Sequence, residues 1–394
     1  MKRPLVIASI GLVLIVSTYV ALHLAQQRAA RELERELEFT KYIKAIERAE
    51  AAEAAVPAIP VSAERRGRYF LNSVFVWNGG VVASMNTKYP PRDRNQRLWM
   101  YDPALDEFVP HPLRQELQRV IGGLRSLAIV SADGTSDLVE FNGARRAMLK
   151  KNVIVPENSA ITFNTRFVFV VSPGSAQAID ATGQVVTSKI DESEITTVEA
   201  SPNELLVSCD QGEFGATLAA YQIGPNGRLG SRKELVQAHI TSSDQDELNN
   251  IWMWGIFRHL GMGSSGLYVY PPGGPIRGLR KNGPVERPDA VAIESPGHVL
   301  VLSGYKGISR VDARGHVEEL WHGRTSIVYR TERVGRATNR DKDTPHSMAL
   351  LGNRLFVASE GLGVYEFERT ADGIRFLRQL HLSPEPAVVP EARR

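Results

Sequence analysis

Three side chains recur at one position of a repeated sequence pattern. They are Glu194, Asp289 and His346, and each stands four residues before an apolar residue of a short predicted strand. Carboxylate oxygens and an imidazole nitrogen are ligands for a divalent metal ion, which would polarise a bound carbonyl group or activate water. Two interpretations remain open: the three residues form a metal site, or each one caps its own strand. A divalent metal ion is the cofactor that this pattern suggests.

A second group of candidates is basic, and it falls on the predicted connections between strands. The group consists of Arg92, Arg94, Arg97, Lys281, Arg287, Arg330, Arg333, Arg336, Arg340 and Lys342. Guanidinium groups bind carboxylates and phosphates well, so these residues predict a binding face for an acidic protein or another anionic ligand. The alternative is ordinary solubilising charge, because the net charge of the chain is only +3. The last five of these residues occupy a segment of roughly 20 residues, predicted to be a loop without structure of its own.

Known catalytic motifs are missing from the sequence. There is no phosphate-binding Walker loop, nucleophile elbow, zinc-protease motif or dinucleotide fingerprint, so catalytic residues stay unknown. The pairs Asp244/Asp246 and Asp341/Asp343 do not continue into a calcium loop, and we expect solvated loop carboxylates. No stacking motif for nucleic acid is present either.

A repeated sequence pattern predicts the strands that position these residues. An apolar strand ending in Ser, a Gly-rich turn and a second apolar strand recur, most clearly at Val299–Asp312 and Leu355–Glu368. The repeats are spaced by about 44 residues on average, the length of a four-stranded propeller blade. Turn formers such as Asp180–Gly183 and Asp312–Gly315 predict further strands beside each pair. The sequence therefore predicts an all-β fold, a seven-bladed β-propeller.

Two of the seven units are irregular. The second would need a strand within Leu113–Ile121, where the residues look helical, and the fifth, Asp246–Arg280, lacks a clear first turn. Six or eight blades are the alternatives. A two-sheet sandwich is a rival architecture, but it would not require a repeated register.

The stretch SPNELLVSCDQGEFGATLAAYQIGPNGRL (Ser201–Leu229) resembles a blade of the seven-bladed lactonase and YVTN-type propellers. Asn282–Pro284 with Pro288–Ala292 is similar to the strictosidine-synthase and gluconolactonase propellers. The resemblance to those enzymes implies a metal in the axial channel and a lactonase-like hydrolase. It covers one or two blades, and their acidic and Asn ligands cannot be matched one for one here.

The N-terminus predicts a membrane anchor. Residues 4–25 carry no charged side chain and follow Lys2 and Arg3, so they can cross a hydrocarbon core of about 30 Å as a helix. The predicted parts are a cytoplasmic tail (1–3), the transmembrane signal-anchor helix (4–25), a helical stalk (26–55), a Pro/Ala linker (56–66), the propeller (67–383) and a flexible tail (384–394). A cleaved signal peptide is the alternative to the anchor.

Together these features predict a single-pass protein of the bacterial inner membrane with its propeller in the periplasm. A homodimer through residues 26–55 is a further expectation, because apolar residues form a short stripe along the stalk. The predicted function is a binding or scaffolding module for a protein or an anionic ligand. The alternative is a metal-dependent hydrolase that uses Glu194, Asp289 and His346.

Overall fold

The computed structural model divides the chain into two units, Met1–Val56 and Pro57–Arg394. The residues that the structure describes all belong to the second unit. They are 70–77, 80–86, 96–110, 117–121, 126–131, 135–140, 148–154, 159–210, 215–238, 240, 242–259, 262–279, 288–303, 306–325, 327–330, 340–343, 345–359 and 363–380.

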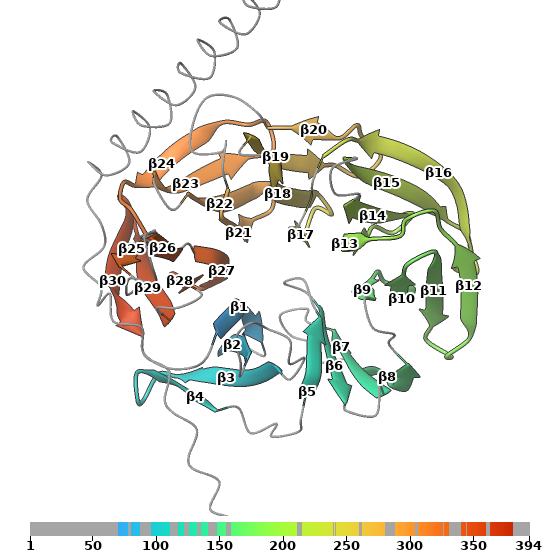
Figure 1. The fold of residues 1–394 in the computed structure, drawn as a ribbon, viewed down its shortest axis with the longest axis horizontal. Helices are drawn as coiled ribbons and strands as arrows, with labels where there is room; N and C mark the ends of the chain where they lie inside the picture. Colours follow the sequence, from blue (N-terminus) through green and yellow to red (C-terminus); the bar gives the residue numbers. More distant parts are fainter. Residues whose placement is uncertain are drawn as a thin grey trace, which may run out of the picture. The chain divides into compact units, whose positions relative to one another are not determined.

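Five sheets each consist of four strands that follow one another in sequence and pair as antiparallel neighbours (Figure 1). The first has β9 (Ala160–Phe163), β10 (Phe167–Ser172), β11 (Ser175–Asp180) and β12 (Val185–Lys189); the second has β13 (Ile195–Ala200), β14 (Glu204–Asp210), β15 (Ala216–Ile223) and β16 (Leu229–Val236). The third has β17 (Ser242–Gln245), β18 (Ile251–His259), β19 (Met262–Tyr270) and β20 (Arg277–Gly278). The fourth has β21 (Ala290–Ser295), β22 (His298–Ser303), β23 (Gly307–Asp312) and β24 (Val317–Trp321); the fifth has β27 (Pro345–Leu351), β28 (Arg354–Ser359), β29 (Gly363–Thr370) and β30 (Gly373–Leu380).

An eight-stranded sheet precedes them along the chain. It contains β1 (Phe70–Trp77), β2 (Gly80–Asn86), β3 (Gln96–Asp102), β4 (Glu107–Pro110), β5 (Leu117–Ile121), β6 (Ser126–Ser131), β7 (Thr135–Glu140) and β8 (Met148–Ile154). One residue pair, Gln96 with Leu117, joins its two four-stranded halves. The expected helical character of Leu113–Ile121 is wrong for residues 117–121, which form β5 and pair with β6. Val120 and Ile121 are β-branched and suit the strand.

The first strands of successive sheets lie against one another. β13 contacts β9 and β17, β21 contacts β17 and β27, and β27 contacts β1. Apolar clusters fill the space between neighbouring sheets, as where Val74 and Trp99 pack with Ala349 and Phe356. The fold is therefore all-β and built from repeated four-stranded antiparallel sheets, an organisation compatible with a β-propeller.

The repeated sequence pattern corresponds to the second and third strands of each sheet. The pairs β22/β23 and β28/β29 have the same register, with Ser303 opposite Gly307 and Ser359 opposite Gly363. In the first four-stranded sheet, the serine that ends the second strand is hydrogen-bonded to a residue just before the first strand. The hydroxyl oxygens of Ser172 and Ser159 are 2.8 Å apart. The repeat thus encodes the two central strands of a sheet.

The predicted turns between third and fourth strands are confirmed. The Asp312 carboxylate accepts backbone N–H bonds from Arg314 at 2.8 Å and His316 at 2.9 Å. Gly315 has a φ of 90°, a conformation that favours glycine because it carries no Cβ. The side chain of Asp180 closes the turn after β11 in the same way, on Thr182 and Gln184.

The segment before the last sheet differs from the expectation of an unstructured loop. β25 (Ile327–Arg330) and β26 (Arg340–Asp343) form a two-stranded antiparallel sheet of their own. The β-branched and aromatic residues of β25 favour this strand. Part of the predicted loop is therefore a hairpin.

The structure leaves the membrane prediction untested. No helix within the described residues is long and apolar enough to span a bilayer. Residues 4–25, the stalk, the linker and residues 384–394 lie outside the described ranges.

Candidate functional site

Each four-stranded sheet has two different edges. The start of the first strand lies beside the end of the second and the start of the third, as Ile195 pairs with Cys209 and Cys209 with Thr217. We call this side of the sheet the loop edge, because the connections between sheets and between second and third strands are here. We call the opposite side the turn edge, because short turns there join the first strand to the second and the third strand to the fourth.

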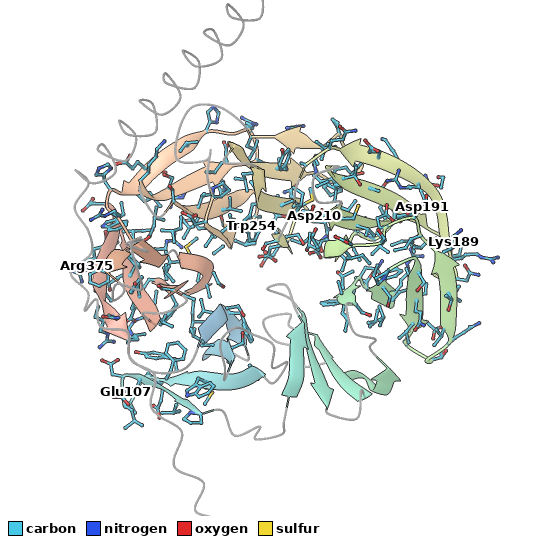
Figure 2. All side chains as sticks on the ribbon, viewed as in Figure 1. Glu107, Lys189, Asp191, Asp210, Trp254 and Arg375 are labelled. Atoms are coloured by element: carbon cyan, nitrogen blue, oxygen red, sulfur yellow. The ribbon has the colours of Figure 1, made fainter. Side chains whose placement is uncertain are left out.

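Glu194 and Asp289 occupy equivalent positions at the loop edge. Each directly precedes the first residue of a first strand, β13 or β21. Glu194 is exposed, and its backbone carbonyl accepts the N–H of Asp210 at 2.9 Å. Asp289 is half-buried and donates its backbone N–H to the carbonyl of Leu302 at 2.9 Å. A backbone bond to the second strand thus fixes each strand start, although Glu194 accepts and Asp289 donates, and Asp210 (labelled in Figure 2) lies beside Glu194.

The third member of the predicted metal site is in the second position of β27, since β27 begins at Pro345 and His346 follows. Its side chain lies outside the described set. No group of three or more His, Cys, Asp or Glu side chains in the described part of the chain is arranged to hold a metal ion. The three-residue metal site stays a prediction.

Four of the ten predicted basic residues lie in the described ranges, and all four are in strands, so the expected placement of Arg97 in a connecting loop is wrong. Arg97 is in β3, Arg330 ends β25, and Arg340 and Lys342 are in β26. The backbone register places Arg330 directly opposite Arg340, and Val328 opposite Lys342. Six of the ten predicted residues lie outside the described ranges, namely Arg92, Arg94, Lys281, Arg287, Arg333 and Arg336.

A polar cluster on the first strands was missed by the sequence analysis. The Glu199 carboxylate in β13 accepts hydrogen bonds from Thr162 in β9 at 3.4 Å and from Ser243 in β17 at 3.2 Å. Ser243 is also 3.1 Å from the hydroxyl of Thr197. Three neighbouring sheets therefore share one hydroxyl–carboxylate cluster, which ties their first strands together. The sequence analysis missed them because they form no local motif, and their contacts depend on which first strands become neighbours.

The expectation of solvated loop carboxylates is wrong for Asp244 and Asp246. Asp244 lies within β17 and is 3% exposed, while Asp246 is fully buried at the turn that follows. The carboxylate of Asp246 accepts the backbone N–H of Gly297 at 2.9 Å and the indole N–H of Trp252 at 3.1 Å. Burial of a carboxylate is costly unless hydrogen bonds satisfy it, and here they join two sheets. Asp246 is a structural residue.

Other buried carboxylates are held by arginines. Glu294 binds Arg310 at 2.6 Å and Arg369 of β29 at 2.8 Å, and this hydrogen bonding raises the pKa of Arg310. Glu366 is fully buried between Arg354 and Arg378, at 2.6 and 2.7 Å. Burial raises the pKa of Glu366, and the charge of Arg354 opposes that shift. These carboxylates stabilise the framework that carries the loop edge.

Comparison with known proteins adds structural similarity alone. No protein-family model matches the chain, and no curated protein matches it. Virginiamycin B lyase from Staphylococcus aureus superposes with a TM-score of 0.45 at 12% identity, over 78% of this chain and 94% of that one. A luciferin-regenerating enzyme superposes with a TM-score of 0.33 at 13% identity, over 56% and 75% of the two chains. Superpositions this weak carry no argument about the activity of this chain.

Proposed function

We propose that residues 67–383 form a closed seven-bladed β-propeller and that its loop edge binds an acidic protein or another anionic ligand. Residues 4–25 anchor it in the bacterial inner membrane, with the propeller in the periplasm. The five four-stranded sheets and the two halves of the eight-stranded sheet support a count of seven. The contact of β27 with β1, from opposite ends of the described residues, supports closure.

The observation that carries the binding role is the β25–β26 hairpin. It belongs to none of the four-stranded sheets, so the repeated framework does not need it. Insertions of this kind on repeat proteins map to one face, which is often the binding face. The backbone register pairs Arg330 with Arg340, and residues of like charge at directly opposite positions are unfavourable unless an anion offsets them. A bound carboxylate or phosphate would supply that anion.

The test uses the full chain in detergent and polyglutamate as a defined anionic probe. Arg330→Glu with Arg340→Glu is expected to weaken polyglutamate binding at low salt by at least tenfold. The matched control is Arg228→Glu with Arg314→Glu, which changes the charge equally at exposed positions on the turn edge. Equal loss in both double variants, or no binding by the unmodified chain, contradicts the proposal.

A second candidate function follows from the equivalent positions of Glu194 and Asp289 before their strands. A divalent ion held by these carboxylates and His346 would make the protein a lactonase-like hydrolase. The purified chain would then retain one divalent ion per molecule, and Asp289→Ala would remove it. A metal-free chain that copurifies with a membrane protein favours the binding role instead.

A further inference from the structure

The β17–β20 sheet differs from the others at its loop edge. Trp254 is the last residue of β18 that pairs with the first strand, and β18 continues for five residues beyond it, Gly255–His259. In the other described sheets the second strand passes its last pairing with the first strand by one residue at most. β19 accompanies β18 along this whole extension, from Met262 to Gly266. A two-stranded ribbon, Gly255–His259 with Met262–Gly266, therefore extends past the sheet.

Both outer edges of this ribbon lack a strand partner among the described residues. On the β19 side, β20 pairs only with Tyr268 and Val269, and one further bond joins the N–H of Leu279 to the carbonyl of Leu267. On the β18 side, the chain that leads into β17 is held elsewhere. The carbonyl of Ile240 accepts hydrogen bonds from Thr196 at 2.6 Å and Ser208 at 3.3 Å, both of the preceding sheet.

The hydrogen-bond pattern shows which backbone groups face the β18 edge. The N–H of Asp246 binds the carbonyl of Asn250 at 3.0 Å, so Asn250 directs its carbonyl toward the first strand. Direction alternates along an antiparallel strand, which places the N–H and C=O of Ile256 and Arg258 on that edge. The Leu279–Leu267 bond agrees, because it makes the odd-numbered residues of β19 the ones that face away from β18.

Within the described residues, the sequence and pairing of the ribbon also give this edge little protection. Exposed edges are normally blunted by proline, lysine or a β-bulge. Residues 255–259 contain neither proline nor lysine, and the pairing of β18 with β19 has no bulge. Ile256 and Phe257 favour β structure, and Arg258 is the one charged residue apart from a histidine. Such an edge is a template for another strand.

We propose that the Ile256–Arg258 edge of the ribbon binds an extended segment of a partner protein by β-strand addition. This inference rests on the proposed function as a binding module and specifies how the partner is held. Backbone hydrogen bonds to Ile256 and Arg258 provide the affinity, and alternate side chains provide the specificity. A lipid surface is the poorer occupant, because hydrocarbon cannot satisfy an open strand edge.

The test is photo-crosslinking of the full chain in the membranes of the cells that make it. The crosslinker is Phe257→p-benzoylphenylalanine, because Phe257 bonds to β19 and leaves the edge free. We expect an adduct with an extended segment of one other protein. Arg258→Pro removes the edge N–H and is expected to lower adduct yield at least tenfold.

Two controls separate edge loss from misfolding. Ser265→Pro, on the other edge of the ribbon, is expected to leave the yield unchanged. An amide-to-ester replacement at position 258 also removes the N–H without fixing φ, and it should reproduce the loss. An unchanged yield in both the proline and ester variants overturns the proposal, as does an adduct with lipid, with a second copy of the chain, or with nothing. If only the anionic-partner proposal fails, Arg330→Glu with Arg340→Glu leaves the adduct intact while Arg258→Pro still removes it.

Discussion

The hydroxyl of Ser347 in β27 accepts the backbone N–H of Val74 in β1 at 3.0 Å and donates to the carbonyl of the same residue at 3.1 Å. The two residues are 273 positions apart in the chain. One side chain therefore satisfies both backbone groups of a residue in the first described strand. We call this contact, together with the side chains around it, the seam between the β1–β4 and β27–β30 strands.

Ser347→Ala is expected to weaken the seam. The variant leaves the N–H and C=O of buried Val74 without this partner, and an unsatisfied buried group costs about 1–3 kcal/mol. Urea unfolding of the full chain measures the change. Ser295→Ala, at an exposed position, serves as the control and should change stability by less than about 0.5 kcal/mol. Equal effects of the two substitutions would show that the Ser347–Val74 contact contributes nothing.

Substitution of Arg378 should destabilise the fold more than substitution of Arg375, although both residues are in β30 and both bind a glutamate. Arg378 bridges fully buried Glu366 and Asp106 across the seam. Arg375 (labelled in Figure 2) binds Glu368 in a surface pair, with 67% of its side chain exposed. Arg378→Ala leaves the buried Glu366 carboxylate with one partner fewer, and it should lower the free energy of unfolding by about 2–4 kcal/mol. Arg375→Ala should cost at most about 1 kcal/mol. Thermal and urea unfolding compare the pair, and a larger loss in Arg375→Ala refutes this ranking.

Thr182 controls the acidity of Asp180. Its hydroxyl donates to the Asp180 carboxylate at 2.7 Å, and this bond is the largest cause that lowers the pKa of Asp180 below 3.8. A lowered folded-state pKa stabilises the fold above the unfolded pKa, and the contribution is lost as pH falls through the folded value. Thr182→Ala should therefore raise the pKa of Asp180 and make unfolding less pH-dependent below pH 3.8. Carboxyl NMR titration measures the shift, and an unchanged pKa contradicts the assignment.

Alanine substitutions at Gly174 and Gly307 should distinguish the cost of backbone strain from the cost of a steric clash. Both have positive φ, 75° and 103°. A Cβ at Gly174 would meet nothing within 4 Å, whereas a Cβ at Gly307 would lie 1.9 Å from the carbonyl oxygen of Trp321. Gly174→Ala should cost about 1–2 kcal/mol through strain alone. Gly307→Ala should cost clearly more, because the backbone of β24 must move. Chemical denaturation tests the order, and equal losses would contradict it.

Much of the framework was predictable from the sequence because it relies on local signals. The second and third strands are apolar runs bounded by glycine, and Asp180 and Asp312 mark turns by capping their own backbone. First strands are harder to find. β17 reads Ser-Ser-Asp-Gln, and its last three residues are each less than 9% exposed, so burial here does not follow hydrophobicity.

The candidate sites could be predicted only in part. Glu194 and Asp289 do precede equivalent strands, since the repeat fixes their position along the chain. The Glu199 cluster and the pairing of Arg330 with Arg340 depend on which strands become neighbours, and spacing within one repeat holds no such information. The ribbon was missed for another reason: the length of β18 is set by its pairing with β19, and Phe257-Arg258-His259 alone does not announce a strand.

Every four-stranded sheet from β9 onward is encoded by one uninterrupted stretch of sequence, and among the described strands none is exchanged between the first and last sheets. A whole module can therefore be duplicated, deleted or moved to the other end of the gene without splitting any sheet. Such rearrangements would have to rebuild one junction of side chains, the one that Ser347 and Arg378 now provide. The architecture thus leaves the number of sheets open to evolutionary change and concentrates the constraint on a few polar residues between the β1–β4 and β27–β30 strands.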